Sequence, residues 1–171
     1  MNDKQVNYTG GAYKIETFRY DGKSLDDHKT ISGKADLMAQ SSMMLHESAE
    51  KSESPQSEFI RLTFEHELLP TPIERYHFFT NMSSAKTIQP SHLDVKFIDV
   101  ANCNITDAKG HPKTCLNVSN PLNESSVPTF YVTLETESIS GFFTENAFHL
   151  MPGQSKIITH VAKYSGKLSE K

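Results

Sequence analysis

The strongest constraint on the fold is a stretch near the C-terminus, residues 141–162, where two strand patterns flank a turn signal. Phe148 and Leu150 alternate with the polar His149, which is the period-two pattern of a strand with one buried face. Pro152-Gly153 suits the central pair of a type II turn, because Pro fixes a negative φ and Gly accepts a positive one. The stretch therefore predicts a β-hairpin made of a strand, a tight turn and a second strand.

The same alternation recurs along most of the chain and predicts a mainly β protein. One segment departs from it: residues 42–51 are rich in helix formers, and Ser41 or Ser42 suits the N-cap of a short helix. The polar residues 81–90 are predicted to link two β units. Strands are predicted over residues 13–20, 35–38, 59–65 and 75–79, and again where apolar residues alternate over 93–97, 116–118 and 130–134.

Composition argues against two classes of partner. The formal net charge of -4 comes with scattered signs and no basic stripe, so no nucleic-acid partner is expected. The sequence holds no run of about eighteen apolar residues, so no membrane span is expected. The spacing of Cys and His matches no zinc site, and neither a metal nor a cofactor is expected.

Five N-x-S/T acceptor sites occur among the nine Asn, where the Ser and Thr content would give roughly two by chance. This excess predicts a chain that passes through the secretory pathway and carries N-linked glycans. The first residues show no signal-peptide pattern, which a fragment of a longer precursor would explain. Three acceptors crowd the segment from Asn104 to Ser125, so that segment is expected to be exposed. The five acceptors are Asn7, Asn81, Asn104, Asn117 and Asn123.

The two cysteines, Cys103 and Cys115, are separated by eleven residues that include a turn signal at Gly110 to Pro112. A turn there would let the flanking strands run antiparallel and bring both sulfurs within bonding distance. In an oxidising compartment such a disulfide would stabilise the fold by roughly 2–3 kcal/mol. Two free thiols, or a partner elsewhere in a longer chain, are the alternatives.

The C-terminal stretch resembles a known family. Its residues, Gly141-Phe-Phe-Thr-Glu-Asn-Ala-Phe-His-Leu-Met-Pro-Gly153, resemble the pattern G-x-F-S-D-N-x-F-x-L-x-P-G in the C-terminal immunoglobulin-like domain of β-mannosidases of glycoside hydrolase family 2. Thr144 and Glu145 depart from that pattern conservatively. The positions that carry this motif are Gly141, Phe143, Asn146, Phe148, Leu150, Pro152 and Gly153.

Further segments resemble the same family in the same order. His66-Glu-Leu-Leu-Pro70 and Arg75-Tyr-His-Phe-Phe79 resemble a segment of the animal lysosomal enzymes, and Asn2-Asp3 resembles the end of a strand that opens their preceding domain. The resemblance implies two immunoglobulin-like β-sandwich units in tandem, the first incomplete at its N-terminus and with one short helix. It divides the chain into a partial domain over residues 1–80, a linker over 81–90, a C-terminal immunoglobulin-like domain over 91–165 and a tail over 166–171.

No residue is predicted to be catalytic. His66-Glu67 begins an H-E-x-x-H pattern, but Pro70 occupies the place of the second His and would break the helix that the pattern needs. Asn123-Glu124 has the letters of the family's acid/base, but it lies in a Ser- and Pro-rich loop inside an acceptor site. The (β/α)8 barrel that carries the two carboxylates of such enzymes takes about 250 residues, more than this chain has.

Two functions from different classes remain. The resemblance implies the non-catalytic C-terminal portion of an exo-acting β-mannosidase, whose partner is the catalytic (β/α)8 barrel of the same parent protein in the lumen of the lysosome. The alternative is a free-standing, secreted β-sandwich module for adhesion or carbohydrate binding. Such modules usually stack sugars on exposed aromatic rings; the chain has no Trp, but it has six Tyr and ten Phe.

Overall fold

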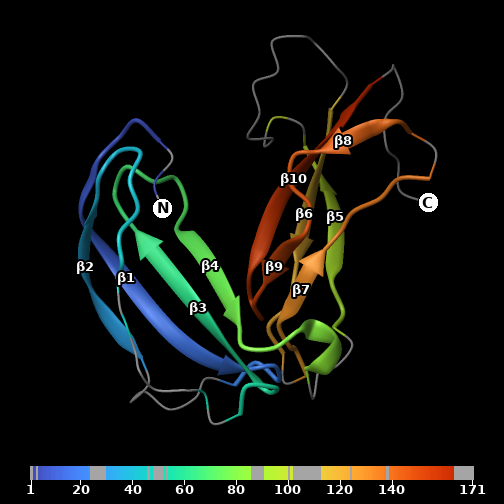
Figure 1. Cartoon of the computed structure of the whole chain (residues 1–171). Helices are drawn as coiled ribbons and strands as arrows, with labels where there is room; N and C mark the ends of the chain where they lie inside the picture. Colours follow the sequence, from blue (N-terminus) through green and yellow to red (C-terminus); the bar gives the residue numbers. More distant parts are fainter. Residues whose placement is uncertain are drawn as a thin grey trace. The chain divides into compact units, whose positions relative to one another are not determined.

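The computed structural model describes residues 2, 4–23, 30–45, 47, 52, 54–85, 91–99, 101, 113–123, 125–137 and 139–163. These residues are mainly β, as Figure 1 shows. They form ten strands and one turn of 3-10 helix, η2 (Met82–Ser84). The chain divides into two compact units, Met1–Ile88 and Gln89–Lys171, which are taken one at a time below. The predicted mainly β class with immunoglobulin-like sheets is confirmed.

Unit 1 is built on a four-stranded antiparallel sheet with the strand order β2-β1-β3-β4. The central β1 bends at a bulge, because its register with β2 shifts between Tyr8 and Gly11. The strands are β1 (Tyr8–Arg19), β2 (Ile31–Leu37), β3 (Glu58–Glu65) and β4 (Ile73–Phe78).

The two faces of this sheet carry different side chains. On one face Phe18 and Phe59 oppose each other across β1 and β3, and their rings stack at 5.6 Å. On the other face Phe64 lies buried in a cluster with Tyr8 and Leu37. Gly11 lies beneath this cluster, and a Cβ there would collide with the ring of Phe64, so the close packing requires glycine.

Asn2 anchors the beginning of unit 1. Its side-chain amide donates to the carbonyl oxygens of Val6 at 2.7 Å and of Met38 at 3.0 Å, and its backbone N–H donates to the carbonyl of Ser41 at 2.8 Å. The residue is buried, and hydrogen bonds of this kind satisfy its polar groups away from water.

The predicted helix over residues 42–51 is wrong where the structure describes it, because residues 42–45 and 47 are not helical. Leu45 packs against the buried cluster of unit 1, and its carbonyl accepts a hydrogen bond from the hydroxyl of Tyr13 at 3.5 Å. Met43 and Met44 remain exposed. The three consecutive apolar residues 43–45 do not form the apolar face of an amphipathic helix. The contact of Leu45 with the sheet therefore determines the conformation of this segment.

Unit 2 packs two antiparallel sheets against each other. The larger sheet has the order β5-β6-β10-β8, and the smaller one pairs β7 with β9. The core lies between them and joins Leu116, Val118 and Ile158 of the larger sheet to Val132, Phe148 and Leu150 of the smaller. The strands are β5 (Asp94–Ile98), β6 (Lys113–Ser119), β7 (Thr129–Val132), β8 (Gly141–Phe143), β9 (Phe148–Leu150) and β10 (Ser155–Ala162).

The turn predicted at Pro152-Gly153 is present, but the predicted β-hairpin is wrong. The N–H of Gln154 donates to the carbonyl of Met151 at 3.0 Å, and Gly153 has a φ of 81°, as a type II turn requires. However, β9 pairs with β7, whereas β10 lies between β6 and β8. The turn carries the chain from one sheet to the other, because Phe148 and Leu150 supply the inner face of the smaller sheet.

The expected exposure of the segment from Asn104 to Ser125 is wrong for most of its described part. β6 lies in this segment between β5 and β10, and its residues Cys115 and Val118 are fully buried. An acceptor site specifies only three residues. The alternation of side chains along a strand can therefore bury residues in the same segment. Asn117 points to the outer face of β6 and is half-buried.

Candidate binding surfaces

A polar groove lies on the sheet of unit 1, on the face that carries Phe18 and Phe59. The register pairs Lys14 with Thr63 and Glu16 with Arg61, so these side chains share that face. The groove has a volume of about 460 Å³, which is within the usual range for small-ligand sites. Its polar lining comes mainly from Lys14, Glu16, Arg61, Thr63, Glu65 and Glu74.

Glu16 is the buried centre of this groove. Its carboxylate accepts from the guanidinium of Arg61 at 2.7 Å and from the ammonium of Lys14 at 2.6 Å. The guanidinium of Arg61 also lies 5.0 Å from the centroid of the Phe18 ring. Burial alone would raise the pKa of Glu16, but the hydrogen bonds from Arg61 and Lys14 outweigh it and hold that pKa below its ordinary value.

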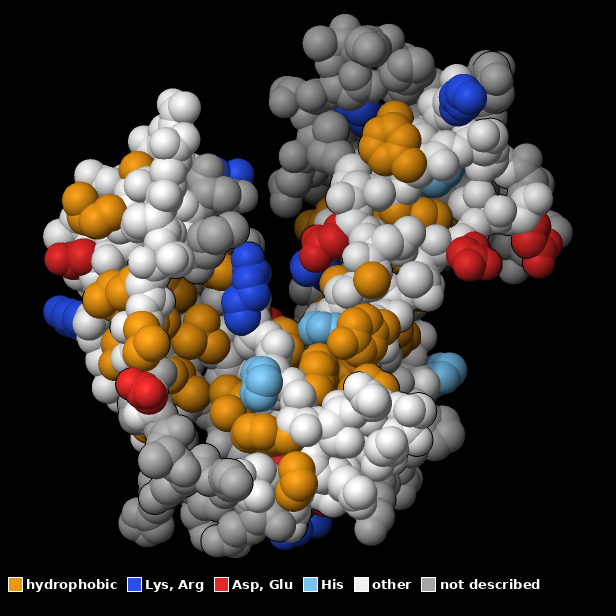
Figure 2. Space-filling view, viewed as in Figure 1, with side chains coloured by type: hydrophobic (Ala, Val, Ile, Leu, Met, Phe, Trp, Pro, Cys, Tyr) orange, Lys and Arg blue, Asp and Glu red, His pale blue; other side chains and the backbone are white. Residues whose placement is uncertain are grey.

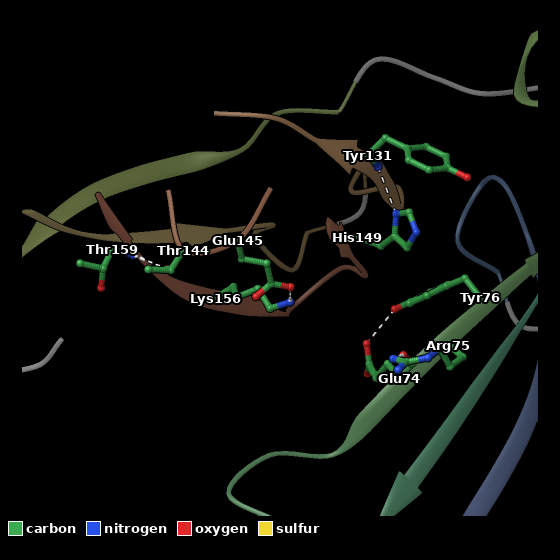
Figure 3. A network of polar contacts seen from close by, with 9 residues as sticks. All are labelled: Glu74, Arg75, Tyr76, Tyr131, Thr144, Glu145, His149, Lys156 and Thr159. Carbon is green, nitrogen blue, oxygen red and sulfur yellow. Dashed lines mark hydrogen bonds and ion pairs between the residues drawn. The ribbon is translucent and has the colours of Figure 1, made fainter. Parts of the chain in front are cut away.

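Tyr76 and Glu74 extend the polar face onto β4. The hydroxyl of Tyr76 donates to the carboxylate of Glu74 at 2.8 Å, as Figure 3 shows. Burial raises the pKa of Tyr76, and the negative charge of Glu74 raises it further. The phenol therefore stays protonated and acts as a hydrogen-bond donor.

Two carboxylates of the groove, those of Glu16 and Glu74, are both engaged by side chains of the same sheet. A retaining glycosidase needs one carboxyl group that donates a proton and one that attacks the sugar. Glu16 is held ionised by two cations, and Glu74 accepts a hydrogen bond from Tyr76. Sequence reasoning missed this network because Glu16 and Arg61 are 45 positions apart. Lys14 and Glu16 lie two positions apart on one face of β1, but this spacing indicates a shared site only when the pairing of β1 with β3 is known.

His66, which begins the H-E-x-x-H-like pattern, has a structural contact instead. Its Nε2 lies 3.1 Å from the carbonyl oxygen of Thr9, and its Nδ1 accepts the N–H of Leu68 at 3.1 Å. A neutral ring with the proton on Nε2 satisfies both contacts. His66 therefore ties the loop after β3 to the beginning of β1, and the described residues contain no group of His, Cys, Asp and Glu that could hold a metal ion.

His160 is buried inside unit 2. It is 1% exposed, its ring lies 5.0 Å from that of Phe143, and neither ring nitrogen has a hydrogen-bond partner among the described residues. Burial lowers the pKa of His160, because a charged imidazolium would lose its hydration there. The neutral ring thus behaves as part of the apolar core.

An aromatic surface lies on the smaller sheet of unit 2; it is formed by Phe130, Tyr131 and His149. The ring of His149 meets that of Tyr131 edge to face at 4.8 Å and that of Phe130 at 5.6 Å. The N–H of Tyr131 donates to Nδ1 of His149 at 3.1 Å (Figure 3). Tyr131 is 51% exposed and has a φ of 54°, which is rare for an aromatic residue.

The residues of the C-terminal motif take structural positions in unit 2. Phe148 and Leu150 are core residues, and Phe143 packs against the same core. The side chain of Asn146 accepts the N–H of Leu134 at 2.7 Å and so closes the loop before β9. Gly141 lies where a Cβ would collide with the carbonyl of Val161 and with the His160 ring, and Pro152-Gly153 forms the turn between the sheets.

The predicted glycan acceptors lie in different environments. Asn7, Asn81 and Asn123 are exposed, Asn117 is half-buried on β6, and Asn104 lies outside the described residues. Glu124, the carboxylate beside Asn123, also lies outside them. Cys115 is buried on β6, where it opposes Ile98 of the antiparallel β5, while Cys103 lies outside the described residues, so the disulfide stays a prediction.

The visible surface shows no large patch of one charge. On the face drawn in Figure 2, the Lys and Arg side chains are interspersed with Asp, Glu and uncharged residues. No helix among the described residues has the length and apolar character needed to cross a membrane.

Comparison with known proteins extends this picture. Residues 122–171 match the family Ig_mannosidase, described as an Ig-fold domain. The chain is similar to the exo-chitosanase CsxA of Amycolatopsis orientalis, with a TM-score of 0.62 and 12% identity over 93% of this chain and 21% of that one. It is also similar to a β-D-mannosidase from Dictyoglomus thermophilum, with a TM-score of 0.59 and 18% identity over 94% of this chain and 17% of that one.

These likenesses show that the chain shares its fold with a part of each of these two enzymes. The match to Ig_mannosidase is confined to residues 122–171. The chain spans 21% and 17% of the lengths of the two enzymes. No curated protein matches the sequence.

Proposed function

We propose that the chain is the non-catalytic C-terminal portion of a β-mannosidase of the lysosomal type. The parent enzyme would remove terminal, non-reducing β-D-mannose residues from oligosaccharides derived from N-glycans. The two units would brace the catalytic (β/α)8 barrel of the same parent protein, and the acceptor sites would carry N-linked glycans in the lumen of the lysosome.

The match of residues 122–171 to Ig_mannosidase is the observation that carries this proposal. The similarity to a β-D-mannosidase and to an exo-chitosanase supports it, since the chain would occupy only a fraction of either enzyme. The groove of unit 1 is consistent with a supporting role, because Glu16 is neutralised by Arg61 and Lys14 and is not available as an acid.

The first test is activity. We expect the purified 171-residue chain to release no product from p-nitrophenyl β-D-mannoside, while the endogenous protein that an antibody against unit 2 precipitates hydrolyses it. That endogenous protein should be several times larger than the 19.2 kDa of this chain. Turnover by the purified chain would overturn the proposal.

A second outcome would point to the other class of function. An endogenous protein of about the chain's own mass, without activity in the precipitate, would identify a free-standing β-sandwich module that is secreted or lumenal. The proposal of an enzyme portion would then be wrong.

A further inference from the structure

We propose that Asn117 carries an N-linked glycan whose first sugar covers Ile157, so that the outer face of the larger sheet of unit 2 points to solvent and not to another part of a parent protein. This inference rests on the proposed function in one respect, because it needs the chain to enter the secretory pathway. It goes further by selecting one acceptor and one surface.

Asn117 and Ser119, which supplies the hydroxyl of its acceptor site, lie on the same face of β6, because residues two apart in a strand point the same way. This face is turned away from the core, since Leu116 and Val118 supply the inner face. β6 lies between β5 and β10. The acceptor site is therefore part of a sheet surface, and strand pairing fixes the neighbours of Asn117 on both sides.

The register places two side chains directly beside Asn117. Ile157 of β10 is its partner on one side, and Lys96 of β5 is its partner on the other. The Cβ atoms of such opposed residues are about 4.5–5.5 Å apart. All three residues reach solvent, because Lys96 is exposed, Ile157 is 41% exposed and Asn117 is half-buried. An exposed aliphatic side chain thus lies next to the point of attachment.

The modification joins Asn117 to a sugar by one bond. Nδ2 of the side-chain amide loses a proton and bonds to C1 of N-acetylglucosamine, while the bond from C1 to the diphosphate of a lipid-linked oligosaccharide breaks. The diphosphate leaves with the electron pair. The amide oxygen of Asn117 stays in place as a hydrogen-bond acceptor.

The attached sugar suits the two neighbours. N-acetylglucosamine has an apolar C–H face and an acetamido methyl group, and both gain from contact with the aliphatic side chain of Ile157. The ammonium of Lys96 has three donors for the sugar's oxygen atoms, and its stem adds apolar surface. The glycan therefore covers a side chain that the described residues leave in solvent.

A single exposed aliphatic residue is ordinary on a protein surface, and its position opposite an acceptor is the informative observation. A protein partner docked flat on this face would bury about 800 Å² on each side. A bulky glycan attached to an interior strand prevents such docking. The units would then brace a barrel only through surfaces other than the one around Asn117.

The acceptor at Asn123 provides a control, because it lies in a loop. Its side-chain oxygen accepts the N–H of Ser125 at 3.0 Å and the hydroxyl of Ser125 at 2.8 Å. Asn123 lies outside the strands, so no pairing fixes an aliphatic side chain opposite it. Loss of a glycan at Asn123 should therefore have little effect on the stability of the sheet.

The first experiment measures occupancy. The full 171-residue chain is expressed behind a secretory signal in mammalian cells with Asn123→Gln, so that Asn117 is the only acceptor between Lys113 and Lys156. Mass spectrometry of that tryptic peptide should find glycan on most molecules. Ser119→Ala should abolish it, and Ser119→Thr should retain it, because Thr keeps the acceptor hydroxyl.

The second experiment measures what the sugar covers. The secreted chain with both acceptors intact is made with high-mannose glycans and trimmed by an endoglycosidase to single N-acetylglucosamine residues. Asn117→Gln and Ser119→Ala should each lower the midpoint of thermal unfolding of unit 2 by about 2–4 °C. With Ile157→Ser already present, the same changes should lower it by less than about 1 °C. Asn123→Gln should leave it nearly unchanged in both backgrounds.

Two results would overturn the inference: a bare Asn117 in the secreted chain, or equal shifts with and without Ile157. If the secreted chain is not recovered, the same peptide from the endogenous protein decides occupancy. Glycan on Asn117 of a small, inactive endogenous protein would overturn only the proposed function. A large, active enzyme with a bare Asn117 would overturn only the present inference.

Discussion

The side-chain amide of Asn120 donates to the carbonyl oxygen of Leu150 at 3.1 Å, across 30 positions of sequence. The same amide donates to the carbonyl of Val127 at 2.8 Å, and the backbone carbonyl of Asn120 accepts the N–H of Gly153 at 2.8 Å. Asn120 therefore joins the end of β6, the approach to β7 and the turn that carries the chain between the two sheets.

Asn120→Ala should destabilise unit 2 by about 2–3 kcal/mol, because it leaves buried carbonyls without their donor. Urea denaturation that follows unit 2 would measure this loss. Glu135→Ala is the control, since Glu135 is an exposed residue of unit 2, and it should change the free energy of unfolding by less than about 0.5 kcal/mol. Equal effects of the two variants would contradict the role assigned to Asn120.

Gly141→Ala should destabilise unit 2 by about 1–3 kcal/mol, because the added methyl group would press on the carbonyl of Val161 and lie 2.5 Å from Nε2 of His160. Thermal unfolding would measure the change. Ser140→Ala, at the exposed neighbouring position, should leave the midpoint nearly unaltered. If the Gly141→Ala protein unfolded at the same temperature as the original, β8 would be able to move away from the added methyl group without loss of stability, and the prediction would be wrong.

Unit 2 should lose stability when the pH falls from 7 to 5. The pKa of His160 is lowered in the folded state, whereas an unfolded His titrates at about 6.5, so below that pH the unfolded chain binds the proton more readily. His160→Leu should reduce this dependence of the free energy of unfolding on pH. The exposed His92 of unit 2 provides the control variant, His92→Leu, which should keep the pH dependence of unit 2.

The carboxylate of Glu16 acts in a different pH window. Its pKa is held below the ordinary 4.5, so its contribution to unit 1 is present above that value and is lost only as the pH falls further. If His160→Leu left the change in the free energy of unfolding between pH 7 and 5 unaltered, the role assigned to His160 would be wrong. Glu16 would not explain that change either.

The predicted disulfide between Cys103 and Cys115 can be tested by alkylation of the denatured chain. We expect no alkylation before reduction when the chain is produced in an oxidising compartment, and two alkylated thiols after reduction. Reduction should lower the free energy of unfolding by roughly 2–3 kcal/mol. Full alkylation without a reducing agent would show two free thiols.

The period-two pattern was enough to predict most of the strands, although β5 and β8 contain no buried residue. Residues 59–65 were predicted as a strand, and the observed β3 covers Glu58–Glu65, with Phe59 and Phe64 buried on opposite faces. The turn at Pro152-Gly153 was also predictable, since its residue types fix the local backbone. Local signals of this kind need only a few neighbouring residues.

The pairing of strands was not predictable in the same way. A tight turn between two strands has the same local sequence whether the strands pair or belong to different sheets. Here β9 pairs with β7, and β10 pairs with β6 and β8, through contacts distant in the sequence. The network of Glu16 and Arg61 depends on the register between β1 and β3. The left-handed conformation of Tyr131 has no signal in its residue type, because tyrosine rarely adopts it.

The position of β10 has a consequence for synthesis of the chain. β10 is the last described strand, yet it lies between β6 and β8 and pairs with both. The larger sheet of unit 2 is therefore incomplete until Ala162 has left the ribosome, and a premature stop before Ser155 removes an interior strand rather than an edge strand. During synthesis, the larger sheet of unit 2 therefore cannot form completely before β10 is made, because β6 and β8 pair with β10 and not with each other.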